Sequence, residues 1–370
     1  MSARFLTVVL ERAFNMRDGF GREIDYMRIS VIDSCNLNCY YCNPCDNNEH
    51  CHALNILSVK EVLCIVRAAT RLGIKHFRLT GGEPLLHPQL DEMVLQIKKI
   101  PGVSSVSLTT NAVLLAQHAK WLKEAGIDSI NVSLDTIDAS EYERITKKPL
   151  LEEVKHGINA AIEYGIRVKI NVVLTPQTDV VALTRYVAKK GTDIRFIEMM
   201  PVGEGHTNGV EPYKKVIGTL SKLYGEPCRI NTEKTKEINS GNDKRKIPDN
   251  GPAEYYIFPE LGIRVGLIQA IHGKFCDTCN RIRVTADGRL MPCLGSSVTM
   301  DLVPDSWDFA DDVEKDFAIV RALRAAIKAK PRCHNFNDNA VTYTKTTETK
   351  TTEIEAAEVN AARNMSRIGG

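Results

Sequence analysis

Two groups of three cysteines are the residues whose type and spacing point most directly to chemistry. The first group is spaced C-x3-C-x2-C and the second C-x2-C-x13-C; their members are Cys35, Cys39, Cys42, Cys276, Cys279 and Cys293. Three thiolates can hold one metal centre, but a closed tetrahedral zinc site or a fully ligated four-iron cluster needs one ligand more. Each group therefore predicts a centre with an open coordination position, which suits the binding of a small molecule.

A closed zinc site is the alternative interpretation of both groups. Cys45, His50, Cys51 or His52 could supply the missing ligand to the first group, and His272 to the second. Because a reducing cytosol disfavours disulfides, the eleven cysteines of the chain are expected to serve metal binding or catalysis. Those outside the two groups show no comparable pattern; they are Cys45, Cys51, Cys64, Cys228 and Cys333.

The elements that must position these cysteines are strands and helices that alternate between residues 27 and 200. Short β-branched runs predict strands at 27–32, 76–80, 105–109, 129–135, 167–173 and 193–199. Amphipathic stretches predict helices at 58–71, 90–99, 115–125, 151–164 and 180–190. Four glycines stand where helices would end: Gly73, Gly126, Gly165 and Gly191. This rhythm predicts an α/β fold, an incomplete TIM-like barrel of six βα units.

Polar and apolar residues alternate along these strands, although strands of a helix-covered parallel sheet usually read as continuous apolar runs. Because side chains alternate across a strand, Ile130, Val132 and Leu134 would face the helices, and Asn131 and Ser133 the interior. The same phase puts four cations on the inner face: Arg28, Arg78, Lys169 and Arg195. A dry interior could not accommodate them unpaired, so a wet, anion-accepting site is predicted. The alternative is internal pairing with carboxylates, namely Asp135, Glu83 and Glu198.

Two short motifs accompany these elements. Gly81-Gly82-Glu83-Pro84 follows the second strand at its carboxyl end, where α/β barrels place their ligands. Paired glycines would let a ligand approach and Glu83 could hold an ammonium group, although a tight turn would use the same residues. Arg281 and Arg283 could grip a phosphate or carboxylate, the alternative being a pair of exposed arginines. The sequence contains no phosphate-loop or dinucleotide-binding motif.

Composition and charge limit the remaining possibilities. The chain has 370 residues, 43% hydrophobic and 25% charged, which argues against a mostly disordered protein. A net charge of +2 gives no general affinity for nucleic acid. No apolar run predicts a membrane helix or a signal peptide, so we expect a soluble cytoplasmic protein. The predicted divisions are a barrel at 1–230, a smaller α+β domain at 231–340 and a Thr-rich tether with a Gly-Gly tail at 341–370.

Several longer motifs resemble a known family. DSCNLNCYYC at 33–42 and LTGGEP at 79–84 resemble radical S-adenosylmethionine (SAM) enzymes. A narrower resemblance is to the GTP 3′,8-cyclases, the family of molybdenum cofactor biosynthesis protein A. It rests on the second cysteine group together with TTN at 109–111, NVSLDT at 131–136, RFIE at 195–198 and RIGG at 367–370. This resemblance extends from about residue 21 to residue 370.

The resemblance implies an activity and its cofactors. Each cysteine group would bind a 4Fe–4S cluster, and the open iron of the first would chelate SAM. Reductive cleavage of SAM would yield a 5′-deoxyadenosyl radical that takes hydrogen from C3′ of GTP. C3′ would then join C8, giving 3′,8-cyclo-7,8-dihydro-GTP, the first step of molybdenum cofactor biosynthesis. The residues implied to contact SAM are Tyr41, Gly82, Thr109, Ser133 and Met200.

A substrate site is implied as well. GTP would lie among Arg28, Arg78, Lys169, Arg195, Arg281 and Arg283, and the open iron of the second cluster would meet its guanine. Catalytic roles are implied for Arg28, Gly369 and Gly370, although disorder is the default for a chain terminus. The chain departs from the family at His76, where lysine is common, and at Ala112, where glycine is usual.

The resemblance also implies partners. These are a flavodoxin- or ferredoxin-type electron donor and a downstream cyclic pyranopterin synthase; a homodimer is allowed, and no nucleic acid or membrane is involved. Two other functions stay open. One is another two-cluster radical SAM enzyme, such as a peptide-modifying maturase, which would need a peptide-recognition mode that the sequence does not show. The other is a zinc-stabilised binding module, which would contain zinc and no iron.

Overall fold

The structure is a computed structural model that describes residues 16–42, 55–202, 205, 209–230, 251–296, 298–302, 312–334 and 336. Several residues named above lie outside these ranges: Cys45, His50, Cys51, His52, Gly369 and Gly370. The predicted tether at 341–370 also lies outside them.

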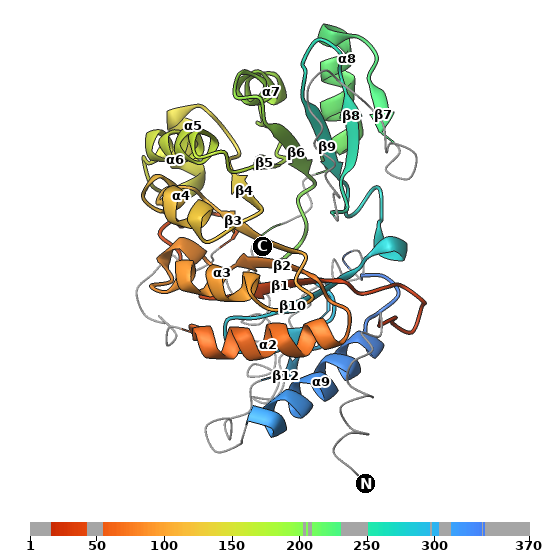
Figure 1. Ribbon diagram of the computed structural model, residues 1–370. Coiled ribbons are helices and arrows are strands. Elements are labelled where there is room, and N and C mark those ends of the chain that lie inside the picture. Colours follow the sequence, from red (N-terminus) through yellow and green to blue (C-terminus); the bar gives the residue numbers. More distant parts are fainter. Residues whose placement is uncertain are drawn as a thin grey trace, which may run out of the picture.

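Six parallel strands form the curved sheet at the centre of the molecule (Figure 1). They are β1 (Tyr26–Ser30), β2 (His76–Thr80), β3 (Ser105–Thr110), β4 (Ser129–Ser133), β5 (Val168–Val173) and β6 (Asp193–Ile197). Helices cover its outer face: α2 (Val59–Arg71), α3 (Leu90–Lys98), α4 (Leu115–Glu124), α5 (Ala139–Thr146), α6 (Leu151–Glu163) and α7 (Val180–Lys189). The strands lie where β-branched runs predict them. The predicted α/β class with a partial TIM-like barrel is confirmed.

Local sequence signals explain where several helices begin and end. Ser58 and Glu61 form a capping box at the start of α2, each side chain accepting a hydrogen bond from the other residue's backbone N–H. Asp138 caps α5, which the sequence analysis did not predict, and Asp179 caps α7. The four glycines predicted at helix ends have φ angles between 63° and 87°, the left-handed conformation such ends require.

The C-terminal part of the chain extends the same sheet at both edges. β10 (Arg281–Val284) pairs in parallel with β1, and β9 (Arg264–Ile268) pairs in parallel with β6. Antiparallel strands follow at each edge: β11 (Arg289–Met291), β12 (Met300–Asp301), β8 (Glu254–Ile257) and β7 (Cys228–Ile230). The division at residue 230 stays a prediction. The pairing itself was not predicted, and it satisfies the open edges of β1 and β6 while bringing the second cysteine group to the barrel.

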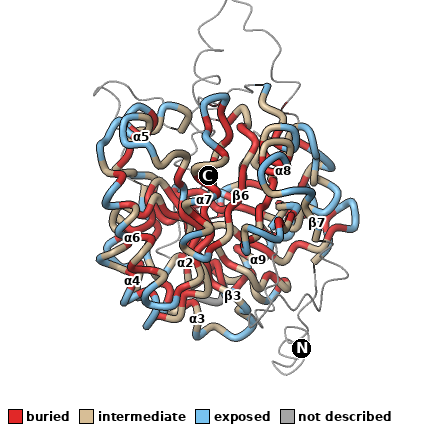
Figure 2. Tube along the Cα trace, turned by 90° about the horizontal axis from the view of Figure 1, so that it is seen from above, coloured by how far each residue is buried: buried red, intermediate tan, exposed pale blue. Residues whose placement is uncertain are grey.

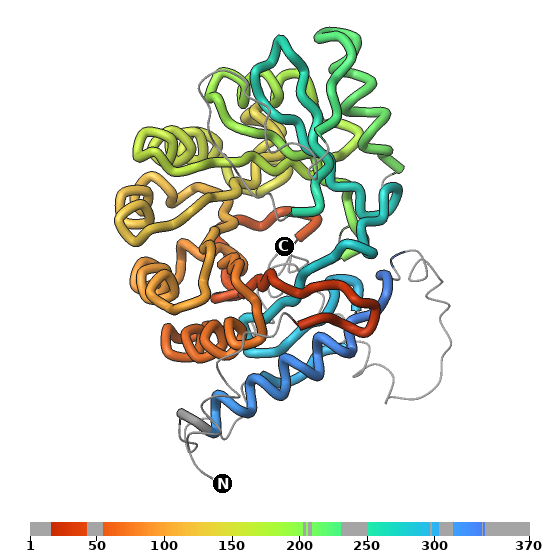
Figure 3. The backbone as a smooth tube through the Cα atoms, turned by 45° about the vertical axis from the view of Figure 1, so that its right-hand side comes forward, coloured from red at the N-terminus to blue at the C-terminus, as the bar shows by residue number. Residues whose placement is uncertain are grey.

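The remaining helices pack around this sheet. They are η1 (Pro84–Leu86), η2 (Tyr213–Ile217), α8 (Gly218–Tyr224), η3 (Cys276–Thr278) and α9 (Asp312–Lys328). α9, not predicted from the sequence, lies along α2 in both Figure 1 and Figure 3. Buried residues concentrate in the strands and the helix sides that face them (Figure 2). Within the described ranges, no helix has the length and apolar character needed to span a membrane.

Candidate active site

The strand register places inward-facing residues side by side across the barrel. Arg28 on β1 lies between its register partners Arg283 on β10 and Arg78 on β2. On the other side of the barrel, Lys169 on β5 is the register partner of Asn131 on β4. The intervening apolar residues of these strands are buried in the core. The alternation predicted from the sequence is therefore present, and a row of three guanidiniums lies along the inner face.

Both cysteine groups open on one cavity of about 600 Å³ inside the barrel. The first group follows the carboxyl end of β1, whereas Cys276 and Cys279 precede the amino end of β10. Because β1 and β10 are parallel neighbours, the two groups lie toward opposite ends of the barrel. The other predicted site residues that line the cavity are Arg28, Tyr41, Arg78, Gly82, Thr109, Ser133, Lys169, Arg195, Met200, Arg281 and Arg283. The structure thus brings together all predicted site residues that it describes.

Of the cations along this cavity, Lys169, Arg195 and Arg283 are buried, and Arg28, Arg78 and Arg281 are half-buried. Burial lowers the pKa of Arg28 well below its ordinary value, and the neighbouring Arg283 guanidinium adds to the shift. Burial and Arg281 lower the pKa of Arg283 to about 10. The Nε of Arg195 donates to Asn171 Oδ1 at 2.9 Å, but its Nη2 is buried without a hydrogen-bond partner among the described residues. Cations that repel one another, with a buried donor left over, indicate a site for an anionic ligand.

The carboxylates that the sequence offered as partners for these cations bind other groups. Hydrogen bonds to them come from Tyr41 for Asp135, from Thr110 for Glu83 and from His272 for Glu198. Burial raises the pKa of Asp135 to about 6 and that of Glu83 to about 7. An adjacent cation would lower both values. Internal ion pairing with these carboxylates is therefore not what neutralises the inner-face cations.

The first cysteine group consists of half-buried thiols with neutral hydrogen-bond donors around them. The Sγ of Cys35 accepts from the Leu37 backbone N–H at 3.4 Å and from the Asn111 side-chain amide at 3.8 Å. Burial raises the pKa of Cys35 to about 11 and that of Cys42 to about 12, and it raises the pKa of Cys39 as well. Thiolates in this pocket therefore need a metal centre to neutralise them, and N–H···S bonds of this kind orient and tune cluster ligands.

The Gly81-Gly82 pair holds the first cysteine loop against the barrel. A Cβ atom on Gly82 would lie 2.1 Å from the carbonyl oxygen of Ser34, and one on Gly81 2.3 Å from that of Ile32. The Gly82 N–H also donates to the Ile32 carbonyl at 2.7 Å. The close contact between this turn and the backbone of Ile32 and Ser34 therefore requires glycine at both positions, independently of any ligand that approaches Gly82. Glu83 is buried outside the cavity lining, so the structure does not support an ammonium-binding role for its side chain.

The residues implied to contact SAM lie at the same end of the cavity as the first group. The Tyr41 hydroxyl donates to Asp135, whose other carboxylate oxygen accepts from the Val173 N–H at 2.7 Å. Thr109 is the penultimate residue of β3, Ser133 ends β4 and Met200 follows β6; all three line the cavity. These positions are carboxyl ends of parallel strands, the usual location of ligands in such barrels.

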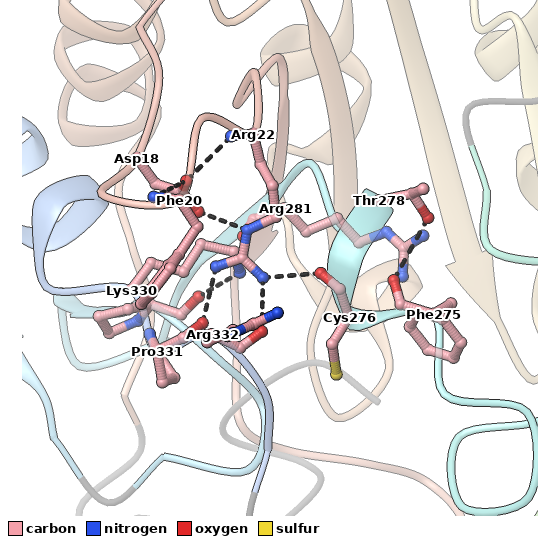
Figure 4. Close-up of polar contacts among 11 residues, drawn as sticks. Asp18, Phe20, Arg22, Phe275, Cys276, Thr278, Arg281, Lys330, Pro331 and Arg332 are labelled. Carbon is pink, nitrogen blue, oxygen red and sulfur yellow. Dashed lines mark hydrogen bonds and ion pairs between the residues drawn. The ribbon is translucent and has the colours of Figure 1, made fainter.

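The second cysteine group is fastened by an arginine that contacts its backbone (Figure 4). Arg22, ion-paired with the buried Asp18, donates to the carbonyl oxygen of Cys276 at 2.7 Å. The same guanidinium donates to the carbonyl oxygens of Pro331 at 2.6 Å and Arg332 at 2.9 Å. One side chain near the start of the described chain therefore joins the second cysteine group to the segment that follows α9.

The zinc alternative is not supported for the second group. His272, its candidate fourth ligand, is not among the residues that line the cavity on which the three cysteines open. In the described ranges, no three or more His, Cys, Asp or Glu side chains are arranged to hold a single metal ion. A four-iron cluster binds its cysteines through separate iron atoms, so it needs them spread more widely than one zinc ion does. The candidate fourth ligands of the first group lie outside the described residues.

Some cavity residues were missed by the sequence analysis. Tyr26 lines the cavity and accepts a hydrogen bond from Arg78; the alternation of β1 could have found it, since it is in phase with Arg28. Asn111 lay within a quoted motif but had no assigned role. Lys330, which also lines the cavity, stands at the end of a helix with no local signal to distinguish it from an exposed lysine.

Both departures from the family pattern have a structural account. His76 lines the cavity, with Nδ1 2.8 Å from Ser105 Oγ, and burial lowers its pKa, so the ring is neutral near pH 7. Ala112 has a φ angle of 66°, in the left-handed region that favours glycine. A Cβ on Gly157 would lie 2.4 Å from the Ala112 carbonyl oxygen, so packing against α6 holds this strained backbone in place.

Comparisons with known proteins agree with this geometry. The family model Radical SAM superfamily matches residues 29–182, and the model Molybdenum Cofactor Synthesis C matches residues 192–336. A GTP 3′,8-cyclase of Clostridium perfringens (strain SM101 / Type A) is 35% identical over 324 residues, covering 87% of this chain and 95% of the relative. One from Petrotoga mobilis (strain DSM 10674 / SJ95) is 35% identical over 331 residues, covering 88% and 96%.

A solved structure supports the fold. The crystal structure of Streptococcus suis SuiB bound to S-adenosylmethionine aligns with a TM-score of 0.54 at 15% identity, over 80% of this chain and 68% of that one. The barrel with a cysteine loop after its first strand is thus that of a radical SAM enzyme. Within that class, the chain belongs to the GTP 3′,8-cyclase family.

Membership of this family defines the cofactors as two 4Fe–4S clusters and SAM. The residues present fit them. Each cysteine group presents three thiols to the shared cavity. The first group has N–H donors to sulfur, and the Nη2 of Arg195 is a buried donor that an anionic ligand would satisfy. The alternative function as a peptide-modifying maturase loses its support, because the alignments with the two cyclases named above cover 95% and 96% of those proteins.

Proposed function

We propose that this chain converts GTP into 3′,8-cyclo-7,8-dihydro-GTP in the cavity between its two cysteine groups. One observation carries the proposal. The groups open on a single cavity from opposite ends, and the row of Arg283, Arg28 and Arg78 lies along its wall. A nucleotide triphosphate is the class of ligand that such a row suits, because guanidiniums bind phosphate through paired, charged hydrogen bonds.

The roles of the site residues follow from their positions. When bound, the first cluster and SAM supply the radical chemistry that removes hydrogen from C3′ of GTP. The chain's residues position the two molecules and exclude water. In this proposal SAM lies against Tyr41, Gly82, Thr109, Ser133 and Met200, and the triphosphate lies among Arg28, Arg78, Lys169, Arg195, Arg281 and Arg283. The second group faces the guanine.

Other parts of the proposal rest on the resemblance. Catalytic roles for Gly369 and Gly370 stay predictions, because both residues lie outside the described ranges. A flavodoxin- or ferredoxin-type electron donor, a downstream cyclic pyranopterin synthase, a cytoplasmic location and a homodimer likewise stay predictions.

The proposal is tested with anaerobically reconstituted protein, a strong reductant, SAM and GTP. We expect formation of 5′-deoxyadenosine that depends on GTP, together with the cyclic nucleotide, both measured by chromatography and mass spectrometry. ATP in place of GTP is the matched control and should give no cyclic product. Absence of GTP-dependent 5′-deoxyadenosine from protein that carries both clusters would refute the assignment.

A further inference from the structure

Lys330 follows α9 where the chain passes the second cysteine group. Its side chain lines the cavity, and the residue is only 3% exposed. The Nζ donates to the carbonyl oxygens of Arg281 and Pro292, at 2.8 Å each. Arg281 lies two residues after Cys279, and Pro292 immediately precedes Cys293. One ammonium group therefore ties together the two chain segments that carry these cysteines.

The Lys330 ammonium lies between the segments that carry Cys279 and Cys293, and both cysteines line the same cavity as Lys330. A buried lysine is unfavourable unless its charge is compensated, and carbonyl dipoles do so only in part. Thiolates of the cysteines on these two segments would supply the missing negative charge when a cluster is bound. Figure 4 shows Lys330 and Arg281 in the same cluster of polar contacts as Cys276.

We propose that Lys330 is the brace and the counter-charge of the second 4Fe–4S cluster. By joining Arg281 to Pro292 it sets the spacing of the segments that hold Cys279 and Cys293, and its charge raises the reduction potential of the cluster. The inference rests on the proposed function only in that the second group binds a cluster. Lys330 acts through the cluster's ligands and is a positioning residue.

The direction of the effect follows from charge. A cluster held by three thiolates is anionic and gains a further negative charge on reduction. A nearby fixed cation therefore stabilises the reduced form more than the oxidised form, most strongly where water is excluded. Lys330 could instead have served the triphosphate, but two of its three donors are committed to the backbone carbonyls of Arg281 and Pro292. A substitution should therefore change the cluster before it changes GTP binding.

The test isolates the second cluster in the full-length chain. Cys35, Cys39 and Cys42 are all changed to Ala, and the parent variant is reconstituted anaerobically and titrated with reductant under electron paramagnetic resonance. In Lys330→Gln, which keeps N–H donors but loses the charge, we expect at least a tenfold lower ratio of reduced to oxidised cluster at a fixed potential, about 59 mV for one electron. Lys330→Arg should stay close to the parent. Lys328→Gln, an exposed lysine at the end of the same helix, is the matched control and should not change the ratio.

The outcomes separate this inference from the proposed function. Loss of iron from Lys330→Met, restored in Lys330→Arg, would support the bracing role. A parental potential in Lys330→Gln with its iron retained would overturn the inference alone. Weaker GTP binding at an unchanged potential would also overturn it, assigning Lys330 to the substrate. A parent variant that takes up no iron would overturn both the inference and the proposed second cluster.

Discussion

The two cysteine groups offer the same ligands in different electrostatic surroundings. The first is surrounded by neutral donors, and burial raises the pKa of all three of its thiols. The second lies beside cations: Arg22 contacts its backbone, and Lys330 and Arg281 lower the pKa of Cys279 against the effect of burial, whereas burial raises the pKa of Cys276. Three cysteines at cluster spacing do not by themselves define a role. The charges around them distinguish a site suited to a zwitterion such as SAM from one suited to a polyanion.

Removing a cysteine should separate the two groups most completely. We expect Cys35→Ala to abolish all cleavage of SAM, because the first group then has too few ligands for the cluster that SAM binds. Cys276→Ala should abolish GTP cyclisation but keep some cleavage of SAM. Iron content and 5′-deoxyadenosine, with and without GTP, are the measurements. Equal loss of SAM cleavage in the two variants would contradict separate roles.

The fastening of the second group by Arg22 should contribute strongly to stability. Arg22→Met leaves the carboxylate of Asp18 buried without its cation, which we expect to lower the free energy of unfolding by about 3 to 5 kcal/mol. The control is Arg71→Met, since Arg71 pairs with Asp316 at 2.8 Å with side chains 41% and 18% exposed. Its expected cost is about 1 kcal/mol or less. Denaturant unfolding followed by circular dichroism measures the free energy of unfolding of both variants. Similar losses in the two would contradict a strong stabilising role for the contacts of Arg22.

Substitutions among the cations that line the cavity and in the Tyr41–Asp135 pair beside the first cysteine group should weaken the binding of different ligands. Arg28→Ala or Lys169→Ala removes charged hydrogen bonds to phosphate, so GTP binding should weaken by about 1.5 to 3 kcal/mol with both clusters intact. Tyr41→Phe removes the hydroxyl that donates to Asp135 and should weaken SAM binding while leaving GTP affinity unchanged. Calorimetric titration of each ligand tests this separation. If Arg28→Ala and Lys169→Ala both bound GTP as tightly as the unaltered protein, the assignment of these cations to the triphosphate would be contradicted.

The smallest expected effect concerns His76, the register partner of Tyr26 in the row that begins with Arg281. Burial lowers its pKa below 6.5, so the ring is neutral at pH 7.5 and becomes cationic only as the pH falls below that pKa. His76→Lys should therefore tighten GTP binding at pH 7.5 by about 1 kcal/mol, roughly fivefold. As the pH is lowered the difference between the two proteins should shrink, because His76 gains its own charge. A constant difference from pH 5.5 to 8 would show that His76 does not titrate in the site.

Much of the barrel could be predicted because its signals are local. Each of the strands β1 to β6 carries its own β-branched run, and α2, α3, α4, α6 and α7 carry amphipathic periodicity. Helices α5, α8 and α9 were missed; the first two are only eight and seven residues long, and the third carries a weaker apolar pattern. The pairing of β10 with β1 and of β9 with β6 was also missed, because a strand sequence states that it will pair but not with which distant edge.

The sequence alone predicted the two cysteine groups as metal sites and the cations of the inner face, since cysteine spacing and strand alternation are properties of neighbouring residues. The tertiary structure decided that both cysteine groups share one cavity, because parallel pairing of β10 with β1 sets them toward opposite ends of adjacent strands. It also decided the contacts of Arg22 with Cys276 and of Lys330 with Arg281. These partners are 254 and 49 residues apart. Contacts at that separation depend on how the whole core packs, and no short stretch of sequence contains that information.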